Sequence, residues 1–287
     1  MTLLVPPRVH DLGGGFTVKR LLPHALARSV GPFVFFDHIG PAQLGPEQGL
    51  DVRPHPHIGL ATVTYLWEGC IAHRDSVGSV QEIAPGDVNW MTAGRGITHS
   101  ERTPARLRGQ PQRMHGLQTW VALPQAHEDD PPSFAHHPKA SLPIVERPGA
   151  RLTVVAGHGF GARSPVAVLV DTLYVSIDLQ AGAELVIPAE HAERALYPVA
   201  GDLALDAEPL PLEHLAVLDA GDTPTLRART DSRVMLLGGA PLDGHRYVWW
   251  NFVASSRERI EQAKADWQAG RFASVPGETE FIPLPER

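Results

Sequence analysis

The stretch "HPHIGLATVTYLWEG", residues 55–69, places two histidines one residue apart and then continues in an alternating pattern. Between residues 61 and 67, alanine, valine, tyrosine and tryptophan fall on one face, with two threonines and a leucine on the other. Such period-two alternation predicts a β-strand. Residues i and i+2 of a strand project to the same face, so His55 and His57 are expected to point the same way.

A second pair with the same spacing, His99 and Glu101, lies in "GRGITHSE", residues 94–101. The intervening "CIAHRDSVGSVQEI" predicts a hairpin that turns at residues 77–79 and could bring the two pairs together. Adjacent strands lie about 4.8 Å apart, close enough for side chains on both to reach one metal at about 2.0–2.2 Å. One such pair among 15 histidines could be a chance neighbour. Two matching pairs predict one metal site built from His55, His57, His99 and Glu101.

The donor set narrows the choice of metal. Three imidazoles and one carboxylate, without a thiolate, suit Fe, Mn, Ni, Cu or Zn. A six-coordinate ion would keep two positions open for water, O₂ or substrate, which favours a redox-competent metal, Fe(II) first. A structural zinc site would normally be closed and rich in cysteine. Cys70 is the only cysteine, so an intramolecular disulfide is excluded and we expect a small core residue there.

Outside these pairs, the chain consists of short apolar runs closed by Gly or Pro, which predicts an all-β protein. Residues 124–143 are rich in proline and charge, and we interpret them as a linker. Beyond it the runs recur in "RLTVVAG", "TLYVSIDLQAG", "AELVIPAE", "RALYPVAG", "HLAVLDAG" and "RVMLLGG". One helix is predicted over 257–269, with Ser255 and Glu258 as capping box, Gly270 as stop, and a buried stripe of Ile260, Ala263 and Trp267.

Chain length and net charge limit the number of domains and the kinds of partner that the protein can have. A chain of 287 residues predicts two domains, which we place at 1–135 and 136–287, the second ending in the helix. The net charge of −7 argues against direct nucleic-acid binding. The sequence contains no run of about 18 apolar residues, so we expect no membrane span. The first residues lack the basic and apolar segments of a signal peptide, so we expect a cytoplasmic protein.

The block "HPHIGLATVTYLWEG…HRDSVG…PGDVNWMTAGRGITHSE" resembles the pirin family of the cupin superfamily, as does "RYVWWNFVASSRERIEQAKADWQAGRF" at 246–272. The resemblance implies two cupin-type β-barrel (jelly-roll) domains packed together, with one metal, usually iron, in the N-terminal barrel. It also implies that His55, His57, His99 and Glu101 are the ligands. The chain departs from the family pattern at Leu60-Ala61, where many members have Phe-Glu, and at His99, which the general pattern places near Ile97.

The resemblance implies two functions of different classes. Several family members are linked to quercetin 2,3-dioxygenase activity, which predicts a small aromatic substrate and O₂ as partners. Glu101 would then act as the catalytic general base. Mammalian members are known as nuclear transcription cofactors. The alternative is therefore a non-enzymatic, iron-containing redox-sensing or regulatory protein that acts through a protein partner.

Other polar residues are weaker candidates. We interpret His73 and Asp75 as a hydrogen-bonded strand pair. His115 is a candidate for supporting the metal ligands, and the Phe36–Asp37–His38 stretch a candidate pocket rim. In the second domain, His191 and Glu193 form an i, i+2 pair without a matching partner pair. We therefore expect no metal in that domain.

Overall fold

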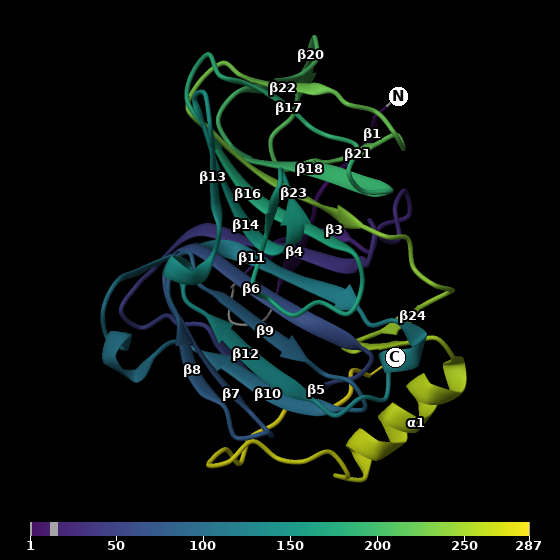
Figure 1. The fold of residues 1–287 in the computed structure, drawn as a ribbon. Coiled ribbons are helices and arrows are strands. Elements are labelled where there is room, and N and C mark those ends of the chain that lie inside the picture. Colours follow the sequence, from purple (N-terminus) through teal and green to yellow (C-terminus); the bar gives the residue numbers. More distant parts are fainter. Residues whose placement is uncertain (1, 12–16, 287) are drawn as a thin grey trace. The chain divides into compact units, whose positions relative to one another are not determined.

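A computed structural model describes residues 2–11 and 17–286 of the chain (Figure 1). The predicted all-β class is confirmed: short strands dominate, and α1 (Arg257–Gln268) is the one α-helix in the described ranges. Three single-turn 3₁₀ helices lie at Ala105–Leu107, Gln125–His127 and Lys139–Ser141. No helix of the described part is long and apolar enough to cross a membrane.

The chain divides into two compact units. The first, which we call the histidine unit, comprises residues 10–11, 17–18, 37–139 and 242–286. The second unit comprises residues 2–9, 19–36 and 140–241. The C-terminal segment thus groups with the histidines, whereas the sequence placed it in the second domain. The reason lies directly after the histidine pair, because Ile58 bridges to Phe252 and accepts a hydrogen bond from Val253 N at 3.2 Å.

The histidine unit contains a four-stranded and a seven-stranded sheet, and its metal-ligand candidates all lie on the four-stranded sheet. A four-stranded sheet has the order β5-β10-β7-β8, and a seven-stranded sheet the order β12-β9-β6-β11-β4-β3-β2 (Figure 1). Strands β3 and β4 have residues in both units. The bounds are β2 (Arg8–Asp11), β3 (Thr17–Leu22), β4 (Phe33–Leu44), β5 (Asp51–His57), β6 (Leu60–Glu68), β7 (Ile71–Asp75), β8 (Val80–Ile83), β9 (Val88–Thr92), β10 (Ile97–Arg102), β11 (Gln112–Ala122) and β12 (Ser133–His137).

Strand β12 corrects the interpretation of residues 124–143 as a linker. Ser133–His137 pairs antiparallel with β9 at the end of the seven-stranded sheet, with Ala135 opposite Trp90. Prolines and charges flank this short run and hide its strand character. At the edge of a sheet such residues are tolerated, because one side of the strand needs no partner.

The second unit contains an eight-stranded and a four-stranded sheet. The first has the order β1-β21-β18-β23-β16-β14-β13, with β15 paired to β14, and the second the order β17-β22-β19-β20. Buried leucines, isoleucines, valines and alanines from both sheets form one apolar core. The bounds are β1 (Leu3–Val5), β13 (Ile144–Arg147), β14 (Ala150–Gly159), β15 (Ala162–Arg163), β16 (Thr172–Leu179), β17 (Glu184–Val186), β18 (Glu193–Ala200), β19 (Leu203–Leu205), β20 (Glu208–Leu210), β21 (Leu215–Leu218), β22 (Thr225–Ala228) and β23 (Ser232–Gly239).

The N-cap of helix α1 lies one residue after the predicted cap, Ser255. Ser256 is the N-cap, and its hydroxyl accepts a hydrogen bond from Arg259 N at 3.2 Å. Ser255 instead donates to Glu128 Oε2 at 2.7 Å, so the predicted capping box is wrong. The predicted stripe is confirmed, because Ile260 and Ala263 are buried and Trp267 packs beside them. The stripe faces a two-stranded sheet of β24 (Tyr247–Trp249) and β25 (Phe252–Ala254).

Gly59 holds the junction between the histidine pair and β6. Its φ is +66°, and an added Cβ would lie 2.0 Å from the carbonyl oxygen of Val253. We expect Gly59→Ala to lower the free energy of unfolding by about 2–4 kcal/mol, from backbone strain plus the clash. Gly78→Ala is the control, because Gly78 has φ +93° with nothing within 4 Å of the added atom. Urea unfolding of both variants checks this, and equal losses would contradict the clash.

Candidate metal centre

Strands β5 and β10 are antiparallel neighbours, as the sequence predicted. His99 lies directly opposite His55, and Ile97 opposite His57. The register shifts between His99 and Glu101, because β5 has one extra residue there, at a point where Pro54 cannot donate to the ladder. Beyond this bulge Glu101 lies opposite Val52 on β5.

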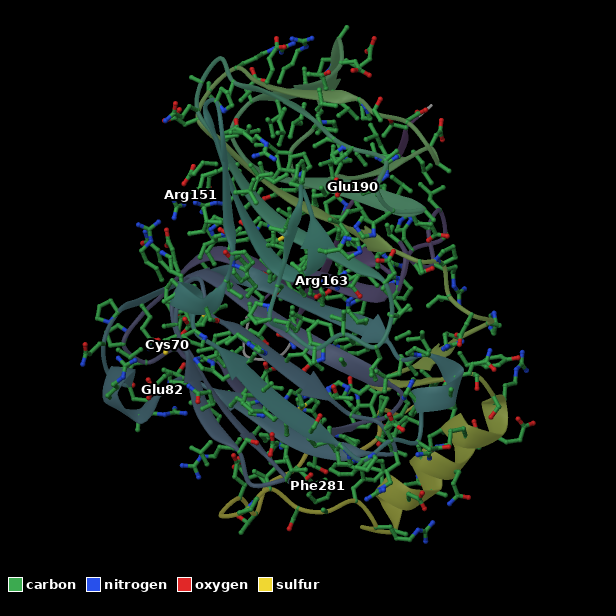
Figure 2. The ribbon with its side chains drawn as sticks, in the orientation of Figure 1. Cys70, Glu82, Arg151, Arg163, Glu190 and Phe281 are labelled. Atoms are coloured by element: carbon green, nitrogen blue, oxygen red, sulfur yellow. The ribbon has the colours of Figure 1, made fainter. Side chains whose placement is uncertain are left out.

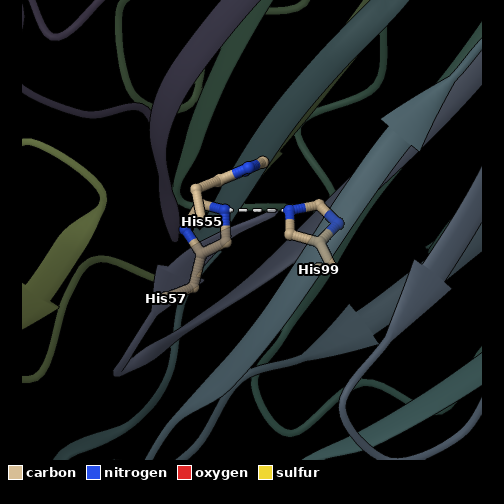
Figure 3. A group of neighbouring side chains, drawn as sticks. All are labelled: His55, His57 and His99. Atoms are coloured by element: carbon tan, nitrogen blue, oxygen red, sulfur yellow. Dashed lines mark hydrogen bonds between the residues drawn. The ribbon is translucent and has the colours of Figure 1, made fainter. Parts of the chain in front are cut away.

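Three histidines converge on one point (Figure 3). One ring nitrogen from each of His55, His57 and His99 lies within 4.8 Å of the other two. Their ring centroids are 4.4 to 5.0 Å apart. The residues are 6%, 1% and 1% exposed, so water satisfies these rings poorly and they need internal partners.

The Nδ1 atoms of the β5 histidines are bound to backbone carbonyls. His55 Nδ1 donates to Arg53 O at 2.9 Å, and His57 Nδ1 donates to Asn251 O at 3.0 Å. A carbonyl oxygen only accepts, so each of these Nδ1 atoms carries the ring proton. In the neutral rings each Nε2 therefore carries a lone pair.

His99 is held through a chain of side chains. Asp75 Oδ2 accepts from His73 Nε2 at 2.8 Å, which confirms the predicted pair and leaves a lone pair on His73 Nδ1. That atom accepts from His99 Nδ1 at 3.4 Å. Burial favours a higher pKa for Asp75, but hydrogen bonds from His73 and Ser79 N outweigh it and lower the pKa. The chain thus also directs the Nε2 lone pair of His99 inward.

The inward lone pairs require a cation. His57 Nε2 and His99 Nε2 are 3.1 Å apart, the pair joined by the dashed line in Figure 3. With both protons held on Nδ1, neither ring can donate to the other. Two nitrogen ligands of one ion at about 2.0–2.1 Å are themselves about 3 Å apart. The three residues therefore fit a divalent metal.

The protonation state of the rings also fits. Burial lowers the pKa of His55 to about 4. Burial, together with the neighbouring histidines, lowers the pKa of His57 and of His99 well below the ordinary value. All three rings are therefore neutral at pH 7, the form in which imidazole binds a metal.

Glu101 is not in the group of donors that lie within 4.8 Å of one another. The Oε1 atom of Glu101 accepts a hydrogen bond from Thr64 Oγ1 at 3.5 Å. On the other side of β10, Glu101 lies opposite His73 of strand β7. Burial raises its pKa, against the opposite effect of His73. Its assignment as fourth ligand stays a prediction.

Asp75→Asn tests whether the chain behind His99 supports metal binding. Asp75 accepts from His73 through one oxygen, and from Val77 N and Ser79 N through the other. An amide has only one accepting oxygen, so one of these sets is lost. We expect metal affinity to fall about 10–100-fold. Asp87→Asn is the control, since Asp87 accepts from Ala84 N and Lys139 N in another turn. Equal affinity of both variants in metal titrations would contradict the role.

The remaining candidates lie elsewhere. His115 Nε2 is 2.9 Å from His38 Nε2 and contacts Trp67, in a buried group that includes none of the three metal-site histidines. Phe36 is 0% exposed and packs edge-on against Tyr197, so it is a core residue and not part of a pocket rim.

Cys70 lies beside Glu82 in Figure 2, with its Sγ 3.7 Å from Glu82 Oε2. Burial raises the pKa of the Cys70 thiol to about 11, which keeps it protonated and unreactive.

The second unit holds a group that the sequence did not reveal. His158, Asp171 and His191 offer three ligand atoms within 4.8 Å of one another. Glu193 is not in this group, and it accepts a hydrogen bond from Gly31 N at 2.7 Å. The three residues lie 13 and 20 positions apart at strand ends, a spacing that matches no familiar ligand motif.

Comparisons with known proteins show which proteins the chain is similar to. The profile of the family described as Pirin matches residues 15–121, and that of the Pirin C-terminal cupin domain matches residues 174–273. A pirin-like protein of Caulobacter vibrioides is 51% identical over 289 residues, covering 99% of each chain. A Pseudomonas aeruginosa protein named "Putative quercetin 2,3-dioxygenase" is 40% identical over 268 residues, which cover 93% of this chain and 83% of that protein. A crystal structure of quercetin 2,3-dioxygenase from Acinetobacter baumannii superimposes with a TM-score of 0.93 at 34% identity, over 100% of this chain and 95% of that one.

Proposed function

Because the chain belongs to the pirin family, we propose that it is a metal-dependent dioxygenase that cleaves flavonols such as quercetin with O₂. His55, His57, His99 and Glu101 would hold the metal, Fe(II) in first place. The observation that carries the proposal is the hydrogen bonding of all three Nδ1 atoms, which leaves three Nε2 lone pairs directed at one point. The similarity to a quercetin 2,3-dioxygenase structure over the whole chain supports the choice of reaction.

When bound, a redox-active divalent ion would supply Lewis acidity for the flavonol hydroxyl and reactivity toward O₂. Three imidazoles and one carboxylate would hold the ion and would leave room beside it for the two reactants. In the overall reaction both atoms of O₂ enter the ring-opened product, and one carbon leaves as CO.

The protein's own contribution would be to move a proton and to exclude water. Glu101 lies two residues from His99 on β10 and would accept the proton of the flavonol 3-hydroxyl. Trp120 packs edge-on against His57 at 5.1 Å, and Phe134 stacks on His73 at 4.4 Å. These two aromatic side chains place apolar surface against His57 and His73, which suits a planar aromatic substrate.

The alternative is a redox-sensing or regulatory protein that binds iron and acts through a partner. The burial of the site favours it, because His57 and His99 are each 1% exposed and a sensor needs no substrate channel. The two functions differ in whether the protein consumes O₂ in the presence of a flavonol.

The test is purification without oxygen, metal analysis, and O₂ uptake with CO detection on adding quercetin. For a dioxygenase we expect one equivalent of O₂ and one of CO for each quercetin lost, faster than with the same amount of free Fe(II). The variant His57→Ala/His99→Ala is the protein control. A loaded protein no faster than free iron would overturn the enzymatic function and favour the regulatory one.

A further inference from the structure

The group His158, Asp171 and His191 is assembled by the end of one strand, β23. Its last residue, Gly239, pairs with Thr172 on one side and with Glu193 on the other. Asp171 and His191 come just before these two residues. His158 lies on β14, which pairs with β16 at Gly157 and Leu173. Three chain segments thus bring three donor side chains together within the second unit.

The carboxylate of Asp171 lies between the two imidazoles. His158 Nε2 is 2.9 Å from Oδ1, and His191 Nδ1 is 2.8 Å from Oδ2. The His191 side chain is 0% exposed, whereas those of His158 and Asp171 are 35% and 38% exposed. One ligand is therefore fixed by packing, and the other two open to water.

The protons of His191 lead to the same conclusion as at the first site. Its Nε2 donates to the backbone oxygen of His158 at 3.1 Å, so Nε2 carries the proton in the neutral ring. Nδ1 then has a lone pair that faces a carboxylate oxygen at 2.8 Å. Two acceptors at this distance repel unless a cation joins them, either a second proton on the ring or a metal.

We propose that His158, Asp171 and His191 bind a second divalent cation of the zinc class, with water at the open position. A second proton on His191 would join only His191 Nδ1 and Asp171 Oδ2, whereas a metal would bind all three converging donors. Two imidazoles, one carboxylate and one water form the ordinary four-coordinate zinc set. Glu190, labelled in Figure 2, adds negative charge nearby, where its Oε2 accepts from Phe160 N at 3.0 Å.

This proposal departs from the expectation of a metal-free second domain. That expectation rested on the lack of a partner pair for His191 and Glu193, but the partners of His191 are His158 and Asp171. With three protein ligands, two of them partly exposed, the site should bind more weakly than the buried centre. The inference is independent of the proposed dioxygenase activity.

The experiment counts bound zinc on the full-length protein after removal of metal by a chelator. Calorimetric titration and elemental analysis should give two equivalents for the wild type, the second weaker. His57→Ala/His99→Ala should keep the weaker equivalent. Adding His158→Ala should abolish it. His158 is partly exposed, so this variant should stay folded, which circular dichroism checks.

His214→Ala in the same double variant is the matched control. His214 lies in the same unit. Its Nδ1 donates a hydrogen bond to the backbone oxygen of the nearby Leu212 at 2.9 Å. We expect this control to keep the weaker equivalent. No zinc bound to the His57→Ala/His99→Ala variant would overturn the proposal, however many equivalents the wild type binds. So would a second equivalent that is unchanged by His158→Ala, or lost equally with His214→Ala.

Discussion

Glu101→Gln is expected to slow quercetin cleavage by about 10²–10⁴-fold while much of the metal stays bound. Glutamine keeps nearly the shape of glutamate and an oxygen that can bind a metal, but it cannot take up a proton at neutral pH. The three histidines, which supply the inward Nε2 atoms, are unchanged. The measurement is O₂ uptake per bound metal under saturating quercetin.

Glu82→Gln is the matched control for this prediction. Glu82 is in the same unit but pairs with Arg106 on the surface, with Oε2 2.7 Å from its Nη2. We expect its turnover to equal that of the wild type. Normal turnover in Glu101→Gln would remove Glu101 as the base and leave the enzymatic function standing.

The prediction that the histidines of β5 and β10 meet rests on the rule that residues i and i+2 of a strand share a face. This rule holds wherever the ladder is regular. His55, His57 and His99 follow the i, i+2 parity and meet as expected. The same parity assigned Glu101 to the ligand set, and that assignment stays a prediction, since the rule takes no account of the bulge on β5 opposite the segment between His99 and Glu101. The register shift between His99 and Glu101 is a property of the two paired strands, and the presence of Pro54 in the sequence is not enough to predict it.

Two differences between the sequence analysis and the structure have local causes. Two consecutive serines offer caps for α1, and tertiary contacts decide between them: Glu128 binds Ser255 and leaves Ser256 to cap the helix. The cluster around Asp171 depends on which strand ends are neighbours. That information lies in the register of β23 with β16 and β18, and not in the spacing of the residues.

His99→Ala is expected to lower metal affinity by about 10²–10³-fold, roughly a quarter of the binding free energy of a four-ligand site. The reason is specific to the proton arrangement. Alanine removes one of three directed lone pairs and leaves His57 Nε2 without the partner 3.1 Å away. His57→Ala should have an effect of the same size, whereas the fold should survive, because the apolar clusters around Ile39 and around Phe252 are built without these histidines. His115→Ala is the control, since it deletes a buried imidazole that contacts His38 and Trp67 instead. Metal titration of the three variants decides: if His99→Ala and His57→Ala bind as tightly as His115→Ala, these histidines are not the ligands.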